Sequence, residues 1–393
     1  DEENEKDIQQ FIDMTEGMKI LDLRGIREFK RLGEITSGQL NDVISLYKYG
    51  IKENPWDDIE REKLENNKIK DRIKGQDVAV EKSISIIKRA KTGFSGLQHS
   101  SASKPKGILF FAGPTGTGKT ELAKAIAELL FGDEGACRRF DMSEYSESHS
   151  AQKLFGAPPG YVGYESGGQL TNTIKEHPFS LLLFDEVEKA SPTIWDKFLQ
   201  ILEDGRMTDG QGNTVYFSEC LIVFTSNLGI YQDVGGVKKR VVDMNMSYNE
   251  LNKVVTKGIQ DYFFSKGKPE VLNRIGKNLI VFNFIQPEAA KEILFSQINK
   301  ICKAVYSMKK IRIEFRNDIV KEKLYQKVLT NLEEGGRGVG NIVEEYFTTP
   351  LSTYVFDNRI ENGQTIIIED ITGLNSDESE LEMPKIIASL ERN

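Results

Sequence analysis

The sequence predicts an α/β fold built on a parallel sheet, followed by a smaller α+β domain. Apolar, β-prone runs alternate with helical patterns, and these runs cover residues 108–112, 181–184, 221–225 and 279–282. Strands that alternate with helices indicate a parallel sheet, whose ligands bind beyond the carboxyl ends of the strands. After Pro287 the pattern is helical over 289–304 and then predicts a short strand over 311–315 and a final strand over 365–369.

The length of 393 residues exceeds one ordinary hydrophobic core, so two or three domains are expected. Changes of pattern place a helical lead-in at 1–70, a large α/β domain at 71–286, a small lid-sized domain at 287–372 and an acidic tail at 373–393. The lead-in rests on helical spacing of apolar residues: Ile8, Phe11, Ile12, Leu40, Val43, Ile44 and Tyr47. Because the chain begins with Asp1, we expect it to be a trimmed or processed piece of a longer protein.

The composition, with 39% hydrophobic and 28% charged residues, is typical of a soluble globular protein, and no apolar run approaches the length of a membrane span. The acidic N-terminal residues do not form a secretory signal. Cys137, Cys220 and Cys302 are few and scattered, which indicates buried thiols in a reducing, cytoplasmic compartment. The net charge of −8 disfavours nucleic acid as a partner.

A phosphate-binding loop follows the first apolar run. Its pattern G-x-x-x-x-G-K-T comprises Gly113, Pro114, Thr115, Gly116, Thr117, Gly118, Lys119 and Thr120. Glycines let successive N–H groups point at phosphate oxygens, and the following helix adds the positive end of its dipole. We expect Lys119 to reach the β- and γ-phosphates and Thr120 to ligate Mg²⁺. The pattern arises by chance in about one chain of this length in a hundred, so a plain glycine-rich turn is a poor alternative.

Two carboxylates end the next apolar run, in the sequence LLLFDE. This is the Walker B pattern, in which Asp185 would hold Mg²⁺ and Glu186 would polarise the water that attacks the γ-phosphate. Asn227 ends the third run and could position that water, although an asparagine in a strand-end turn is otherwise unremarkable. Adjacent acidic residues are common on surfaces, but their place after a P-loop favours catalysis.

The segment GAPPGYVGY, residues 156–164, is too rich in glycine and proline for a helix or a central strand. Bulky side chains between glycines indicate an exposed loop that holds a binding partner through nonspecific contact. A tyrosine buried beneath a turn is the alternative that these residues leave open.

Several long motifs agree in order and spacing with one family. GPTGTGKTELAKAIAELLFG, DMSEY, GAPPGYVGY, LLLFDEVEKA, LEDGRMTDGQG and FTSNLG together resemble the Clp-type AAA+ unfoldases, and among them the C-terminal ATPase ring of ClpB-like disaggregases. The resemblance covers about residues 36–372. It implies a five-stranded parallel sheet between helices, an α+β lid domain, ATP with Mg²⁺, and assembly of identical chains into a ring of six.

The resemblance also implies roles for individual residues. A pore loop of Gly160, Tyr161, Val162 and Gly163 would contact threaded polypeptide through Tyr161, and a second hairpin at 204–215 would face the same pore. Arg274 in KPEVLNR corresponds to the arginine finger, which reaches the nucleotide of a neighbouring subunit, and Arg337 in GGRG to the sensor arginine of the lid. Ile73 and Gly75 would lie on the adenine side. Taken singly, each arginine would more often be a solvated surface charge.

The sequence departs from the family pattern in three places. Lys74 replaces an apolar residue before Gly75, and Asn341 replaces a second arginine four residues after Arg337. Past Leu228-Gly229-Ile230, the insert up to Lys257 contains no apolar-Gly-apolar tripeptide of the kind that members with a protease partner carry, which disfavours a peptidase partner. The upstream ATPase ring and the coiled-coil middle domain of ClpB are missing, which is consistent with a fragment or with a single-ring relative.

These observations predict an ATPase that unfolds or remodels unfolded or aggregated proteins by pulling them through a central pore. A nucleotide-controlled scaffold or regulatory switch with slow turnover is the alternative, favoured by Lys74 and Asn341. A nucleic-acid motor is the weakest hypothesis because the chain is acidic.

Overall fold

The computed structural model describes residues 68–94, 104–374 apart from Ser148 and Val162, and 383–392. Earlier in the chain it describes α2 (Ile20–Arg31) and the single residues Thr15, Met18, Ile44, Tyr47, Pro55, Trp56, Ile59 and Leu64. The expected helical spacing at Ile8, Phe11, Ile12, Leu40 and Val43 lies outside the described residues, as does the acidic segment 376–382. Among the helices that are described, none combines the length and apolar character needed to cross a membrane.

The chain forms two compact units. The first unit takes in the described residues up to Ile73, then Val78–Gly113 and Lys119–Val281. The second takes in Lys74–Asp77, Pro114–Gly118 and the described residues from Phe282 onward. The change from one unit to the other at Val281 falls close to the predicted boundary at 286, and two short segments of the earlier chain, one of them in the P-loop, belong to the second unit.

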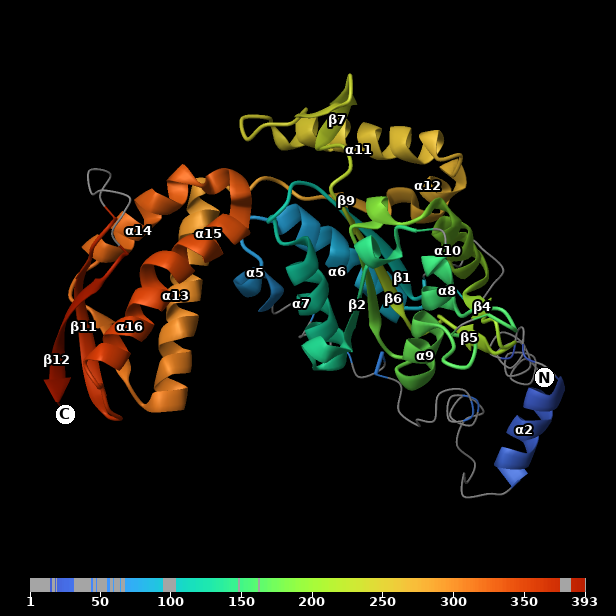
Figure 1. The fold of residues 1–393 in the computed structure, drawn as a ribbon. Helices are drawn as coiled ribbons and strands as arrows, with labels where there is room; N and C mark the ends of the chain where they lie inside the picture. The colour runs from blue at the N-terminus through green and yellow to red at the C-terminus, as the bar shows by residue number, and fades with distance from the viewer. Residues whose placement is uncertain are drawn as a thin grey trace. The chain divides into compact units, whose positions relative to one another are not determined.

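A five-stranded sheet forms the centre of the first unit (Figure 1). Its spatial order is β2-β3-β6-β1-β9 and every neighbouring pair is parallel, which confirms the predicted sheet. The strands are β1 (Gly107–Ala112), β2 (Cys137–Asp141), β3 (Leu181–Asp185), β6 (Leu221–Ser226) and β9 (Leu279–Val281). Residues of β3 and β6 are buried throughout, as expected for strands covered on both faces.

Helices cover this sheet, with α7 on one side of the strands and α10 on the other in Figure 1. From residue 68 onward, the α-helices of the unit are α5 (Lys68–Arg72), α6 (Asp77–Lys91), α7 (Lys119–Phe131), α8 (Ser150–Phe155), α9 (Gln169–Glu176), α10 (Pro192–Asp204), α11 (Tyr248–Ser265) and α12 (Pro269–Ile275). Two hairpins complete it: β4 (Arg206–Thr208) pairs with β5 (Thr214–Tyr216), and β7 (Tyr231–Val234) pairs with β8 (Val237–Arg240). The first is the hairpin predicted at 204–215.

Aromatic side chains fill one face of the sheet. Phe224 lies in register with Phe110 on β1 and Phe184 on β3, and its ring packs against both. Trp195 and Phe198 of α10 and Phe263 of α11 close over these rings, with 4.8 Å between the ring centroids of Trp195 and Phe263. The apolar face of α10 is buried.

This packing predicts opposite outcomes for two adjacent phenylalanines of α11. Phe263 is fully buried, whereas Phe264 is 64% exposed. We expect Phe263→Ala to lower the free energy of unfolding of the first unit by about 3–5 kcal/mol, because it leaves a cavity beside Trp195. Phe264→Ala, the matched control, should change it by no more than about 0.5 kcal/mol. Urea unfolding followed by tryptophan fluorescence measures both, and equal losses would contradict this account of the core.

The thiols agree in part with the expectation of buried cysteines, because Cys220 is buried whereas Cys137 and Cys302 are only partly buried. Cys220 is fully buried, and burial raises its pKa to about 12. Burial likewise raises the pKa of the half-buried Cys137 to about 11. All three cysteines are free thiols. A thiol with so high a pKa is a poor nucleophile at neutral pH, so these residues act as small apolar side chains.

The second unit is an α+β domain, as predicted. Its helices are α13 (Pro287–Lys309), α14 (Ile319–Thr330), α15 (Gly335–Val343) and α16 (Thr349–Asp357), and its strands are β10 (Arg312–Phe315), β11 (Gln364–Ile371) and β12 (Ile386–Arg392). The sheet order is β10-β11-β12, with β10 parallel and β12 antiparallel to β11. Apolar residues of all four helices and of the sheet share one core.

The strand β12 corrects the sequence analysis, which expected its last strand at 365–369 and an acidic tail beyond 372. Residues 386–392 pair with the whole length of β11, and Ile386 is buried in the core of the unit. The acidic residues at 376–382, just before this strand, led the sequence analysis to assign the whole end of the chain to a tail. The pairing partner that makes these residues a strand lies many residues earlier, so local composition could not reveal it.

Candidate nucleotide-binding site

Sheet register brings the candidate residues of the first unit to one edge. Asp141 at the end of β2 lies opposite Asp185 at the end of β3, and Ala112 at the end of β1 lies opposite Ser226 on β6. Because all these strands are parallel, the segments that follow them emerge at the same edge of the sheet. The sequence-predicted P-loop, Walker B carboxylates and Asn227 therefore all begin there.

The P-loop has the backbone conformation that its glycines allow. Gly113, Gly116 and Gly118 have φ values of 144°, 77° and 97°, a region that side chains rarely adopt. Within the second unit the carbonyl of Gly116 accepts a hydrogen bond of 2.8 Å from the N–H of Gly336. A Cβ on Gly116 would lie 2.2 Å from the carbonyl oxygen of Glu334, so glycine is required there by close approach as well as by φ.

Lys119 and Asn227 are brought together across 108 residues of sequence. The buried ammonium of Lys119 donates to the carbonyl of Gly113 at 2.7 Å and to Oδ1 of Asn227 at 2.9 Å. Because of the bond to Gly113, the Lys119 side chain folds back over the P-loop. The second bond places the strand-end amide of Asn227 beside the P-loop lysine, a contact that the sequence analysis did not predict.

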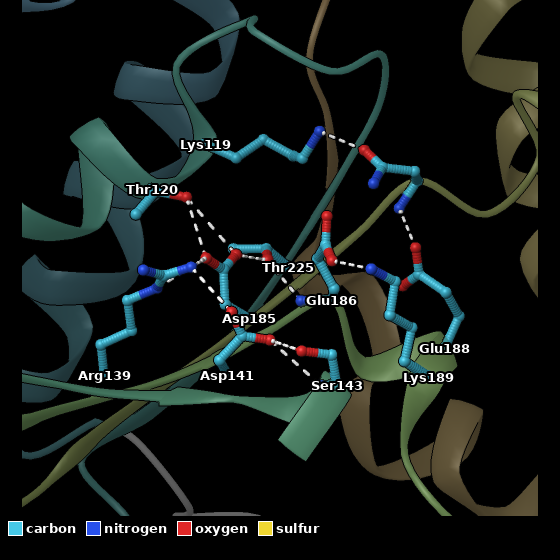
Figure 2. Close-up of polar contacts among 11 residues, drawn as sticks. Lys119, Thr120, Arg139, Asp141, Ser143, Asp185, Glu186, Glu188, Lys189 and Thr225 are labelled. Carbon is cyan, nitrogen blue, oxygen red and sulfur yellow. Dashed lines mark hydrogen bonds and ion pairs between the residues drawn. The ribbon is translucent and has the colours of Figure 1, made fainter. Parts of the chain in front are cut away.

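Asp185 is almost buried and accepts several hydrogen bonds. Thr120 Oγ1 lies 3.4 Å and 3.5 Å from its two carboxylate oxygens, and the hydroxyl of Thr225 donates a short hydrogen bond to Oδ1 (Figure 2). The residues predicted to ligate Mg²⁺, Thr120 and Asp185, are thus neighbours. A hydroxyl and a carboxylate are hard oxygen donors of the kind that Mg²⁺ prefers, so the donor set fits this ion.

Glu186 has an unusual backbone for a residue with a side chain. Its φ of 58° and ψ of 52° lie in the left-handed region, at a cost of about 1–2 kcal/mol. Its N–H donates to Thr225 Oγ1 at 3.1 Å, and its carboxylate forms an ion pair of 2.5 Å with Lys189. The hydrogen bond with Glu186 raises the pKa of Lys189, so this lysine stays charged. Backbone strain of this kind is concentrated at functional sites.

Four further polar residues belong to this cluster and were not singled out from the sequence: Arg139, Asp141, Lys189 and Glu188. Arg139 forms ion pairs with both Asp185 and Asp141 (Figure 2). A hydrogen bond from the Ser143 hydroxyl holds the pKa of Asp141 below its usual value, and Glu188 Oε1 accepts the N–H of Asn227 at 3.0 Å. The DMSEY and LLLFDEVEKA motifs contain three of the four, but only strand register shows which of their side chains meet.

Tyr161 lies on the glycine-rich loop between α8 and α9, and its side chain is 62% exposed. Gly160 and Gly163 on either side have φ values of 87° and 91°, while Val162 is outside the described residues. The exposed aromatic agrees with a gripping loop and excludes the alternative of a tyrosine buried beneath a turn.

The β4-β5 hairpin braces this loop. Gln211 at the hairpin turn donates from Nε2 to the carbonyls of Tyr164 at 2.7 Å and Glu165 at 3.2 Å. Asp209 holds the turn by accepting the N–H groups of Gln211 and Asn213. A Cβ on Gly210 would lie 2.0 Å from the carbonyl oxygen of Ala157, so the two segments touch through their backbones.

The other predicted site residues lie on other elements of the two units. Arg274 on α12 forms an ion pair with Glu203 of α10, with 2.9 Å between Nε and Oε1. Arg337 is exposed on the first turn of α15 in the second unit. Of the residues predicted to lie on the adenine side, Ile73 is buried in the first unit, whereas Gly75, with φ 70°, lies in the second unit, where a Cβ would approach Ala289 within 2.7 Å.

Lys74 and Asn341, the two residues that differ from the family pattern, each contact a carboxylate within the second unit. Lys74 forms an ion pair with Glu292 of α13 at 3.3 Å. The Gln76 amide donates to the Asn283 carbonyl and accepts its N–H, which anchors the segment to the start of the unit. Asn341 donates to Glu334 at 3.3 Å.

Comparisons with known proteins agree with this geometry. A family model described as AAA domain (Cdc48 subfamily) matches residues 104–278. The chain is 37% identical to the chaperone protein ClpB of Bdellovibrio bacteriovorus over 304 residues, which is 77% of this chain and 33% of that protein. It is 41% identical to ClpB of Propionibacterium freudenreichii over 270 residues (68% and 29%) and 33% identical to the mitochondrial ClpB4 of Arabidopsis thaliana over 362 residues (90% and 36%). The chain thus spans about a third of the length of these relatives.

Proposed function

We propose, from the premise that the chain belongs to the Clp-type AAA+ ATPases, that it is the motor module of a protein-remodelling machine. The module binds a nucleotide at the carboxyl edge of its sheet, hydrolyses ATP and moves a polypeptide with the exposed loop around Tyr161. The relatives are named chaperone proteins, and clients that are unfolded or aggregated proteins come to this chain as part of the proposal.

The residues of the cluster divide the hydrolytic reaction between them. Lys119 binds phosphate oxygens, and Thr120 with Asp185 would hold Mg²⁺, which supplies charge compensation for the phosphate groups. Glu186 accepts the proton of the attacking water, and Asn227 orients that water while it keeps its bond to Lys119. For Glu186 to act, its carboxylate must break its ion pair with Lys189. Because Lys189 is half exposed, water can solvate its ammonium group once the pair opens.

Arg274 supports the proposal that several copies act together. Its partner Glu203 is also on the surface, and an exposed ion pair contributes no more than about 1 kcal/mol. The guanidinium can therefore exchange this carboxylate for a phosphate of a neighbouring copy. A ring of identical chains would bring the two together. The roles of Arg337, Ile73 and Gly75 stay those that the resemblance implies.

The observation that carries the threading function is the braced loop with its exposed aromatic. A tyrosine that is 62% exposed between two glycines contributes nothing to a hydrophobic core, so its side chain is available to a partner. The Gln211 side chain and the close backbone approach at Gly210 give the loop a support on the β4-β5 hairpin through which force can be transmitted. An aromatic ring contacts any polypeptide sequence, as a motor without sequence preference requires.

Truncation of Tyr161 tests this function. We expect Tyr161→Ala to retain basal ATPase activity and to lose stimulation by an unfolded model protein such as casein, by about tenfold or more, as for a central aromatic anchor. Steady-state phosphate release with and without casein measures the effect. Tyr231→Ala is the matched control, because Tyr231 is similarly exposed, at 53%, but lies on the β7-β8 hairpin. Normal casein stimulation in the Tyr161 variant would refute threading by this loop.

The regulatory scaffold remains the second candidate, and the ion pair between Glu186 and Lys189 favours it because a restrained catalytic carboxylate gives slow turnover. A scaffold would assemble with ATP, hydrolyse it slowly and ignore casein. The same ATPase measurement, accompanied by sedimentation with and without ATP, therefore separates the two functions.

A further inference from the structure

Arg139 places a fixed positive charge against the carboxylate of Asp185. Its Nε and Nη2 both lie 2.8 Å from Oδ2 of Asp185, which is the geometry of a strong charge-assisted hydrogen bond. Asp185 is almost buried, and an ionised carboxylate with so little solvent requires a partner of opposite charge. Arg139 supplies that charge from the neighbouring strand β2, whose residues Cys137, Arg139 and Asp141 share one face.

A divalent cation held by Asp185 would need a carboxylate oxygen that Arg139 already contacts. Thr225 occupies Oδ1 of Asp185, and Arg139 occupies Oδ2, so an ion that approaches this carboxylate meets an oxygen already engaged by a guanidinium. Two cations on one carboxylate repel each other, and the repulsion is strong where solvent is scarce. Arg139 and the ion therefore compete for Asp185.

Asp141 offers Arg139 an alternative partner without a large movement. Arg139 Nη2 already lies 3.3 Å from Asp141 Oδ2. The other oxygen of Asp141 accepts the Ser143 N–H at 3.0 Å and the Ser143 hydroxyl at 2.6 Å, so this carboxylate is held in place (Figure 2). The Arg139 side chain is half exposed, which leaves its guanidinium room to shift toward Asp141.

We propose that Arg139 is the resident counter-cation of Asp185, which a divalent cation must displace onto Asp141 before nucleotide binds with the ion. Arg139 is thereby a positioning residue that sets the Mg²⁺ concentration at which the site loads. The inference rests on the proposed function, in that it takes Asp185 as the residue that holds the ion.

The test measures the Mg²⁺ concentration that half-saturates the binding of a fluorescent ADP analogue to the full chain. Arg139→Met removes the competitor and should lower this concentration by about fivefold, the size expected from loss of one partly exposed ion pair. Arg138→Met is the matched control, because Arg138 is the adjacent residue on the opposite face of β2, and it should leave the value unchanged.

A second variant tests the alternative partner. Asp141→Asn leaves Arg139 with Asp185 alone and should raise the half-saturating Mg²⁺ concentration, opposite to Arg139→Met. In the double variant the Asp141 substitution should not change the half-saturating Mg²⁺ concentration further, because the Arg139 guanidinium that Asp141 would accept is already absent. A purely structural ion pair would show neither the opposite signs nor this dependence of one substitution on the other.

The outcomes separate the inference from the proposed function. If the wild-type chain binds the ADP analogue without any need for Mg²⁺, the assignment of Asp185 to the ion is wrong. If wild-type binding does depend on Mg²⁺ but Arg139→Met leaves the half-saturating concentration unchanged or raises it, the competition is refuted and the assignment of Asp185 stands.

Discussion

Glu186→Gln is expected to lower the rate of ATP turnover by about 10²–10⁴-fold and to leave nucleotide binding intact. The substitution keeps the size and hydrogen-bonding shape of the side chain but removes the carboxylate that accepts a proton. Neither the left-handed backbone at this position nor the bond from its N–H to Thr225 depends on the side-chain charge. The fold and the phosphate contacts should therefore persist while the chemical step fails.

Two measurements on this variant are needed together. Steady-state phosphate release reports turnover, and equilibrium titration with a fluorescent ATP analogue reports binding. Glu176→Gln, at the exposed end of α9, controls for the loss of one surface carboxylate. Turnover at the wild-type rate in Glu186→Gln would show that Glu186 is not the catalytic base. Loss of nucleotide binding as well as turnover would indicate that Glu186 contacts the nucleotide rather than the attacking water.

Lys119→Met is expected to weaken nucleotide binding by about 10²-fold, because a hydrogen bond to a charged group contributes about 1.5–3 kcal/mol. The ammonium would be the main positive side chain at the P-loop, and its bonds to Gly113 and Asn227 hold it over the loop. Methionine preserves the length of the buried stem but offers no donor to phosphate. Affinity should fall for ADP and ATP alike, unlike the Glu186 variant, which should bind both.

Stability must be followed in the same variant. Loss of the lysine leaves the Gly113 carbonyl and the Asn227 amide without this donor, at a cost of about 1–3 kcal/mol if nothing replaces it. Thermal unfolding without nucleotide measures this cost separately from affinity. Lys124→Met, on the same helix α7, is the control for removal of a lysine. Unimpaired ADP affinity in a folded Lys119→Met chain would contradict the phosphate-binding role.

The local motifs were predictable because each depends on contiguous residues. The P-loop from Gly113 to Thr120 carries its own glycines, lysine and hydroxyl, and the apolar strand before it determines where the loop starts. The Walker B carboxylates likewise end an uninterrupted buried strand. The glycines around Tyr161 already indicated an exposed loop, but the resemblance to a known family added Arg274 and Arg337, whose surroundings alone would not have distinguished them from other surface residues.

The strand β12 and the charged partners of the Walker B carboxylates were not predictable in this way. Residues 386–392 follow an acidic segment, and they are a strand because β11 offers them hydrogen bonds. Lys189 lies three residues after Glu186 and could have been suspected from the sequence. Its contact with Glu186 nevertheless depends on the left-handed backbone turn at Glu186.

The sequence by itself determined the class of fold, four of the five strands at the centre of the first unit and the residues expected to bind phosphate, because these follow from local periodicity and from contiguous chemical groups. Only the tertiary structure decided which charges meet. Arg139 and Asp185 are 46 residues apart and Lys119 and Asn227 are 108 apart, and each pair is joined by the register of parallel strands. Register depends on the packing of whole faces of the sheet, which short stretches of sequence do not specify.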